Sequence, residues 1–413
     1  MLRKTIGLYR DAYRGLPREA WILALADFIN RCGFMVLVFL NLYLIRRLGF
    51  SLIQAGQVLS AYGLGSIIGG YLGGHLCDRL GVRKIQLGSL ILSGTILILA
   101  GYAEKFLPVF VLLFLYGMTA AAIFPANDTV ITRLCSGDLL TKGFALRRLA
   151  ANLGITFGPV IGGFLILLDY RWLFWVDGLT TLASAAVIAA LIKPLPAVAA
   201  DRRLRPARSP WRDGPYLAFL GFMLILMVVF SQLFSTFNLY LNTVYGLPEN
   251  MIGPLWAVNT ILIVAVEMVL IHKLQGRSGI KMVALGGILI SLGFALLPFG
   301  RGFLFAALTV AIWTMGEILS MPFASTIAAS RAGDAIGRYM GLYSLMFSTG
   351  MLIAPYAGNW LYAKIGGDAL WPLAGGIGVL ASAGILTLRG TLDRPKAPEN
   401  GRPGSESQSI TTS

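Results

Sequence analysis

Charge is scarce in this sequence. Only 13% of its 413 residues are Asp, Glu, Lys or Arg, whereas 56% are hydrophobic. A soluble domain usually carries about 25% charged residues, so this chain cannot cover itself with a polar surface. Its apolar residues fall in runs of about twenty, the length of helix that crosses roughly 30 Å of hydrocarbon. The sequence therefore predicts an all-α polytopic membrane protein.

Cysteine and histidine are also scarce. The three cysteines, Cys32, Cys77 and Cys135, have the spacing of neither a metal site nor a disulfide framework, so we interpret them as free thiols. The sequence contains no phosphate-binding loop with lysine and no nucleophile–base constellation. We therefore expect no enzymatic activity, no metal and no cofactor, and a proton gradient as the driving force for any transport.

The basic residues are distributed unevenly between alternate loops. We predict twelve membrane-spanning helices, from residues 20–44 to residues 370–388. Of the 34 Lys and Arg residues, 27 then fall on one side of the membrane, six on the other, and Arg31 within a span. Because short cytoplasmic loops are enriched in Lys and Arg, this asymmetry places both termini in the cytoplasm. A net charge of +15 could by itself suggest binding to nucleic acid. The placement of the basic residues in alternate loops argues against that partner.

The chain divides into two similar parts. We predict an N-terminal six-helix bundle at residues 1–192, a basic cytoplasmic linker at 193–215, a C-terminal six-helix bundle at 216–388 and a disordered cytoplasmic tail at 389–413. The linker alternates proline with arginine, a composition that favours contact with anionic lipid headgroups.

A charged turn after the second predicted span supports the repeat. Its characteristic residues are Gly74, Asp78, Arg79, Gly81, Arg83 and Lys84. A weaker copy occurs at residues 274–281, where three residues recur at a constant offset, and Gly88 recurs at the same offset as Gly286. We expect Gly74 and Gly81 to permit a tight turn and the charged residues to act as a conformational gate.

A glycine-rich stretch in the fifth predicted span is also repeated in part. It contains Gly154, Gly158, Pro159, Gly162 and Gly163, and a partial copy occurs at residues 350–358. Small residues at every fourth position allow close helix packing, and a proline permits a bend. Packing and a flexible bend, one that helps the protein switch conformation or limits ion leak, both remain open here.

These features resemble the major facilitator superfamily of secondary transporters. The turn matches that family's loop pattern G-x-x-x-D-R-x-G-x-R-K at every specified position. The resemblance implies two pseudo-symmetric six-helix bundles, twelve transmembrane helices, and a substrate bound near the midplane between them. The residue 154–163 stretch resembles a motif of proton-linked drug antiporters. At the end of the fourth span, Arg133 stands where many relatives place an acid, and Asp128 lies more than one turn deeper.

A second resemblance points to proton-coupled oligopeptide transporters. Asp27, Asn30 and Arg31 resemble a degraded E-x-x-E-R motif, with Asn30 in place of its second acid. Glu317 resembles a glutamate that those transporters use near the amino end of a peptide.

Charges inside the membrane need a physical reason, because each costs about 2.5–3.5 kcal/mol on insertion scales. Asp27 and Arg31 are four residues apart, so we expect them to pair with each other, either for stability or to control a proton on Asp27. Glu317 has no partner in sequence, and burial favours the neutral form of such a carboxyl group. We predict proton coupling or substrate binding at these residues, at Asn30 and at Glu267.

Two further acids in predicted spans receive other roles. Asp128 and Arg133 are predicted to belong to the gate. Asp177 is expected to lie beside an aromatic belt at the outer membrane interface.

Three functions remain open. The sequence favours proton-driven antiport that exports small amphipathic or cationic compounds. The alternatives are proton symport of a peptide, sugar or other metabolite, and a lipid flippase or non-transporting membrane protein. We expect a small-molecule substrate, protons and membrane lipids as partners, a functional monomer, and a bacterial inner membrane as the location.

Overall fold

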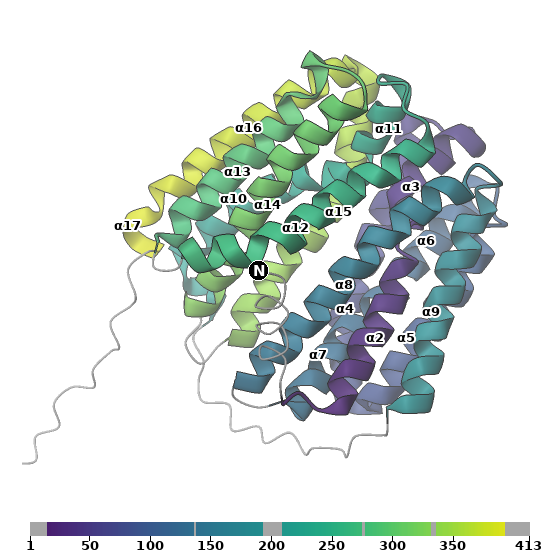
Figure 1. Cartoon of the computed structure of the whole chain (residues 1–413), viewed down its shortest axis with the longest axis vertical. Helices are drawn as coiled ribbons and strands as arrows, with labels where there is room; N and C mark the ends of the chain where they lie inside the picture. The colour runs from purple at the N-terminus through teal and green to yellow at the C-terminus, as the bar shows by residue number, and fades with distance from the viewer. Residues whose placement is uncertain (1–14, 136–137, 193–208, 275–276, 332–335, 393–413) are drawn as a thin grey trace, which may run out of the picture.

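The computed structural model describes residues 15–135, 138–192, 209–274, 277–331 and 336–392, and within these ranges every regular element is a helix (Figure 1). The first half contains α2 (Arg18–Cys32), α3 (Val36–Leu42), η1 (Tyr43–Arg47), α4 (Leu52–Leu80), α5 (Val82–Ala100), α6 (Phe106–Ala121), α7 (Ile123–Leu134), α8 (Asp138–Leu165) and α9 (Arg171–Leu191). The second half contains η2 (Pro210–Arg212), α10 (Gly214–Ser231), η3 (Gln232–Phe234), α11 (Thr236–Thr243), α12 (Glu249–Leu274), α13 (Gly279–Ala295), η4 (Leu297–Phe299), α14 (Phe303–Arg331), α15 (Ile336–Ile365), α16 (Gly367–Thr387) and α17 (Arg389–Leu392).

The helices form two groups that lie side by side (Figure 1). We call residues 18–191 the N-terminal bundle and residues 214–392 the C-terminal bundle. Most of the predicted linker and tail lie outside the described residues. The first four residues of the predicted tail form the helical turn α17, and Arg331 donates a hydrogen bond to the Thr391 carbonyl at 3.1 Å.

Ten helical segments among the described residues are long and apolar enough to cross a membrane. The other two predicted spans correspond to α4 and α15, which have 29 and 30 residues. Both are rich in glycine and polar residues, and they pack against each other. A helix that faces another helix does not need the apolar surface that lipid requires, which explains why composition alone does not identify them.

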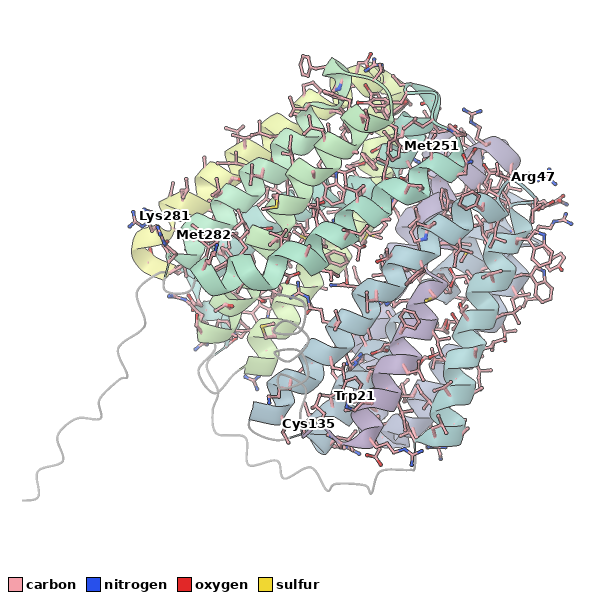
Figure 2. The ribbon with its side chains drawn as sticks, viewed as in Figure 1. Trp21, Arg47, Cys135, Met251, Lys281 and Met282 are labelled. Carbon is pink, nitrogen blue, oxygen red and sulfur yellow. The ribbon has the colours of Figure 1, made fainter. Side chains whose placement is uncertain are left out.

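The molecule has two ends, which we name by the charged turn. The motif end carries residues 80–82 and their counterpart at residues 277–279, and the opposite end carries residues 47–51 and 244–248. Figure 2 shows Trp21 and Cys135 at the motif end of the N-terminal bundle and Lys281 at that of the C-terminal bundle. Arg47 and Met251 lie at the opposite end.

Two helix pairs bring the bundles together, α8 with α12 and α4 with α15. In each pair a glycine packs against the carbonyl oxygen of a proline on the partner helix. A Cβ atom on Gly253 would lie 2.4 Å from the Pro159 oxygen, and one on Gly56 would lie 2.9 Å from the Pro355 oxygen. Because these contacts leave no room for a side chain, the backbones touch directly at this level. The two pairs are pseudo-symmetric, as the internal repeat predicts.

The contacts between bundles concentrate toward the opposite end. Asn41 and Asn359 exchange two amide hydrogen bonds, of 2.9 and 3.2 Å. Asn238 donates to the Val38 carbonyl at 2.7 Å, and Ser60 to the Leu352 carbonyl at 2.6 Å.

The clusters of buried apolar side chains also differ between the two ends of the molecule. One cluster of buried side chains includes residues of both bundles, among them Phe39, Phe237 and Trp256. Two further clusters each belong to one bundle, around Leu23 and Val130 in the first and in the second around residues 216–227. The bundles are therefore joined at the opposite end and have separate cores toward the motif end.

Candidate functional site

The first membrane span is broken in its middle. Helix α2 ends at Cys32 and α3 begins at Val36. The Asp177 carboxylate of α9 accepts a hydrogen bond from the Val36 N–H at 3.3 Å, which satisfies a backbone donor that the break exposes. At Gly33 a Cβ would lie 2.1 Å from the Thr180 hydroxyl, so α9 approaches the break closely. The break thus needs both a small residue on span one and a carboxylate on α9.

Asp177 therefore has a different environment from the predicted one. Its side chain is buried, at 3% exposure, and lines a pocket inside the N-terminal bundle, whereas we expected it beside an interfacial aromatic belt. Of the aromatic residues that precede it, Trp172 is exposed whereas Phe174 is buried. Asp177 faces inward because it lies on the side of α9 that packs against α2.

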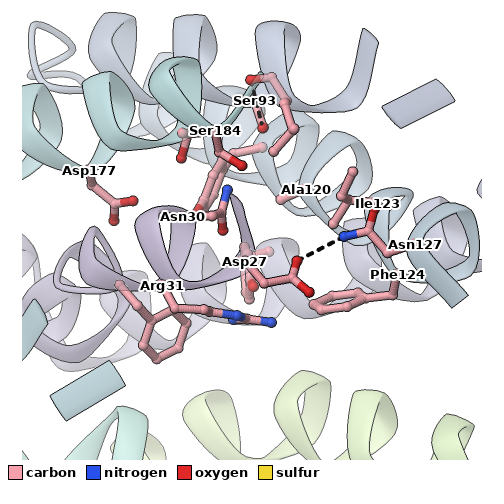
Figure 3. Close-up of a pocket in the computed structure, with 15 residues that line it drawn as sticks. Asp27, Asn30, Arg31, Ser93, Ala120, Ile123, Phe124, Asn127, Asp177 and Ser184 are labelled. Atoms are coloured by element: carbon pink, nitrogen blue, oxygen red, sulfur yellow. Dashed lines mark hydrogen bonds between the residues drawn. The ribbon is translucent and has the colours of Figure 1, made fainter. Parts of the chain in front are cut away.

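Asp27 forms an ion pair with Arg147 of α8, with 2.6 Å between its carboxylate oxygen and Nε. A second acid, Asp128 of α7, pairs with the same guanidinium at 2.6 Å. Asn127 donates a 2.8 Å hydrogen bond to Asp27 (Figure 3) and accepts one of 2.8 Å from Gln86. Asp27 is therefore held by a cation and an amide from two other helices.

This arrangement corrects the expected pairing of Asp27 with Arg31. Among the described residues, no carboxylate lies within ion-pair distance of Arg31. Its guanidinium instead lies over the rings of Phe34 and Phe124, at 5.5 and 5.1 Å from their centroids. Spacing of four residues permits a pair on one helix but does not enforce it. Arg147 of α8 forms the ion pair with Asp27 in place of Arg31.

The pocket inside the N-terminal bundle brings several of these residues together. Asp27, Asn30, Arg31 and Asp177 line it, with Tyr62 among the other lining side chains (Figure 3). Asn30 was predicted as part of the site and lies in this pocket. Its amide is a neutral group between charged neighbours, which suits hydrogen bonding rather than proton transfer.

Glu317 lies on α14 in the C-terminal bundle. Its carboxylate accepts a 3.0 Å hydrogen bond from Asn259 of α12, and Asn259 also donates to the Thr314 hydroxyl at 3.0 Å. No basic side chain among the described residues forms an ion pair with Glu317. This placement agrees with the prediction of an acid in the membrane without a counter-charge.

Glu267 forms an ion pair with Arg148 of α8, across the two bundles. Among the described residues this is the only ion pair that joins the bundles. The Glu267 side chain is 12% exposed and that of Arg148 is 53% exposed. Glu267 lies eight residues from Asn259 on α12, or about 12 Å along the helix axis, so the two acids occupy different levels of the protein.

The charged turn is only partly as predicted. Gly81 has a φ of 91°, a conformation that glycine adopts without strain, and it separates α4 from α5. Gly74, in contrast, lies within α4, where a Cβ would meet only Pro125 at 3.8 Å. The prediction that Gly74 shapes the turn is therefore wrong, because α4 continues to Leu80.

The basic residues of the turn differ in their contacts. Arg83 donates hydrogen bonds to the carbonyl oxygens of Ala189, at 2.8 Å, and Ile192, and so ties α5 to the end of α9. Arg79 and Lys84 are exposed. Arg133 is half-buried at the end of α7 without an ion pair among the described residues. The side chain of Asp78 lies outside the described part of the chain.

The glycines of α8 have separate packing roles. Cβ atoms on Gly154, Gly158 and Gly162 would lie 2.6, 3.1 and 2.7 Å from atoms of the first span, the nearest belonging to Arg31, Cys32 and Met35. These three glycines share one face of α8 and let it pack against the break in span one.

The other two residues of this stretch face the second bundle. A Cβ on Gly163 would lie 2.8 Å from the Glu249 carbonyl, and the Pro159 carbonyl meets Gly253. Close packing is thus the role that the contacts support. Pro159 lies inside an uninterrupted helix, and its role in a flexible bend stays a prediction.

The sequence interpretation missed Arg147 and Arg148 as partners of the acids. The count of basic residues assigns both to the cytoplasmic loop, although the predicted bounds of the fifth span, residues 144–168, include them. A basic pair within a span was therefore the signal that could have found them. Asn127 and Gln86 carried no such signal. No group of three or more possible metal ligands occurs among the described residues.

The comparisons with known proteins agree with this architecture. A model of the Major Facilitator Superfamily matches residues 23–355. The uncharacterised MFS-type transporter YqjV of Bacillus subtilis (strain 168) is 25% identical, over 82% of this chain and 85% of its own. The multidrug resistance protein MdtH of Cronobacter sakazakii (strain ATCC BAA-894) is 24% identical, over 84% and 88%.

Solved structures show the same fold. A POT family transporter in complex with 5-aminolevulinic acid superposes with a TM-score of 0.79 at 14% identity, covering 92% of this chain and 98% of its own. A mutant of the nucleoside transporter NupG gives a TM-score of 0.77 at 14% identity, covering 89% and 99%. The predicted fold class is confirmed by these likenesses and by the two helical bundles. The chain is a multi-pass membrane protein that belongs to the Major Facilitator Superfamily of transporters.

Proposed function

We propose that this protein is a secondary active transporter that exchanges protons for small amphipathic or cationic compounds and exports them. The observation that carries the proposal is Glu317, an acid within a membrane span whose only described side-chain partner is the neutral amide of Asn259. A carboxylate without a counter-charge in this environment gains strongly from binding either a proton or a cation. Competition of the two for one carboxylate is the minimum that antiport requires.

Alternating access would follow from the contacts between the bundles. Those contacts are neutral hydrogen bonds and close backbone packing at the opposite end, with separate cores toward the motif end. Rocking of one bundle against the other about α8–α12 and α4–α15 would part the opposite end and close the motif end. The positive-inside count supports a cytoplasmic motif end. The relatives YqjV and MdtH are bacterial, which supports a bacterial inner membrane, and MdtH is named for multidrug resistance.

Flux in proteoliposomes tests this proposal. An imposed pH gradient should drive tetraphenylphosphonium against its concentration gradient, and Glu317→Gln should reduce this flux at least tenfold while leaving facilitated exchange of the cation measurable. Asp368→Asn, which neutralises an exposed carboxylate of the same bundle, serves as the matched control. Wild-type flux that ignores the pH gradient, or a Glu317→Gln variant with unchanged gradient-driven flux, would contradict the proposal.

A second function, proton symport of a peptide or another carboxylate-bearing metabolite, is favoured by Arg31. This arginine has no ion-pair partner among the described residues and lines the pocket of the N-terminal bundle. A guanidinium there could bind an anionic group of a substrate. Uptake of a labelled dipeptide by cells that express the protein, lost in Arg31→Gln, would favour symport over antiport.

A further inference from the structure

The Arg148–Glu267 ion pair is the starting point, because it is the one described ion pair between the bundles. Its two side chains differ in exposure, with 53% for Arg148 and 12% for Glu267. Arg148 can therefore move into water at little cost. Glu267 cannot, and a largely buried carboxylate that loses its partner needs another cation or a proton.

The pseudo-symmetric helix pair shows that this charge is not needed for packing. The first repeat aligns Glu267 with Gly69 of α4, and the second aligns Arg148 with Ser344 of α15. Gly69 itself packs against Met118 of α6, and α4 meets α15 through Gly56 and Gly63 instead. Among the described residues no ion pair joins α4 to α15. The charges on α8 and α12 are an addition to an interface that forms without them.

We infer that Arg148 is a built-in competitor for a cationic group of the substrate at Glu267, and that a bound cation takes its place there. The inference rests on the proposed function and deepens it by naming a second carboxylate in the substrate path. An amphipathic cation that enters from the motif end would meet Glu267 first. Asn259, which donates a hydrogen bond to Glu317, lies about 12 Å further along the axis of α12. Each cation that binds at Glu267 releases Arg148 and removes the ionic link between the bundles.

The consequence for affinity follows from the competition. A ligand that binds only when the ion pair is open has its affinity reduced by the fraction of molecules in which the pair is open. Removal of Arg148 should abolish this reduction. If the pair is formed in most molecules, the gain in affinity should be about threefold to tenfold.

Equilibrium binding of tetraphenylphosphonium to the purified full chain, at constant pH and without a gradient, tests this inference. Arg148→Gln should bind the probe about threefold to tenfold more tightly than wild type, and Glu267→Gln should lose most of the binding. The double variant Arg148→Glu, Glu267→Arg keeps an ion pair between the bundles but places the cation on α12, so it should stay folded and bind the probe weakly.

Unchanged or weaker binding to Arg148→Gln would overturn the inference, and so would undiminished binding to Glu267→Gln or no binding to any variant. The proposed antiport is tested by gradient-driven flux, which this binding measurement does not involve. If wild-type flux ignores the pH gradient and Arg148→Gln still binds the cation more tightly, antiport fails and the competition at Glu267 stands.

A distance measurement supplies a second readout. Spin labels at Phe144→Cys on α8 and Lys273→Cys on α12, with the three native cysteines replaced, report how far the motif ends stand apart. Arg148→Gln should lengthen this distance, and the charge-swapped double variant should restore it. A distance that is the same in all three proteins would show that the ion pair does not link the bundles, and would overturn that part of the inference.

Discussion

The acids within the membrane spans have different partners in the two bundles. In the N-terminal bundle Asp27 receives a cation from Arg147 and an amide from Asn127, and Asp128 shares the same cation. In the C-terminal bundle Glu317 receives only the amide of Asn259. A carboxylate fixed by an ion pair stabilises the charged form and the fold, whereas one held by an amide can change its protonation with little structural loss. We therefore expect the first network to be structural and the second to be available for transport chemistry.

Removal of Arg147 is the largest expected disruption. Arg147→Met leaves the largely buried Asp27 without its counter-charge, so the free energy of unfolding should fall by about 3–5 kcal/mol, as for other broken buried pairs. Asp128 should contribute little to this loss because its side chain is 55% exposed. Thermal unfolding in detergent measures the effect.

Arg133→Met provides the control, because this half-buried arginine at the end of α7 has no ion pair among the described residues. Its effect should stay within about 0.5 kcal/mol. Equal losses in the two variants would remove the evidence that the Arg147 network stabilises the N-terminal bundle.

Neutral substitutions of Asp27 and Glu317 compare the contributions of the two acids to stability. Asp27→Asn replaces a charge-assisted hydrogen bond with a neutral one and should cost about 1–3 kcal/mol. Glu317→Gln should cost less than about 1 kcal/mol, because the new amide oxygen can still accept the Asn259 hydrogen bond. Thermal unfolding of both variants under one set of conditions decides this, and a larger loss for Glu317→Gln would reverse the assignment of the two networks.

The sequence predicted the architecture better than the site. Apolar runs, the basic asymmetry and the repeated turn depend on local composition, which a sequence records directly. The pairing of Asp27 depended on which helix approaches it, and four-residue spacing favoured Arg31 over the distant Arg147. Asp177 appeared interfacial because its neighbours are aromatic, although its own side chain faces α2.

Two other positions also differ from the prediction. Gly74 looked like a turn residue, but α4 continues through it to Leu80. Arg148 looked like a loop cation, but its long side chain reaches a different bundle. The contact of Arg148 joins residues far apart in the chain, which helical periodicity does not report.

The interface glycines compare the two pseudo-symmetric helix pairs. A Cβ on Gly253 would lie closer to the Pro159 oxygen than one on Gly56 to the Pro355 oxygen, at 2.4 against 2.9 Å. Gly253→Ala should therefore lower the free energy of unfolding by about 1 kcal/mol, at the low end for overpacking because the bundles can shift apart slightly. Gly56→Ala should have a smaller effect, and Gly70→Ala almost none, since open space surrounds that position. Apparent melting temperatures should rise in the order Gly253→Ala, Gly56→Ala, Gly70→Ala. The reverse order would mean that α4–α15, and not α8–α12, is the tighter contact between the bundles.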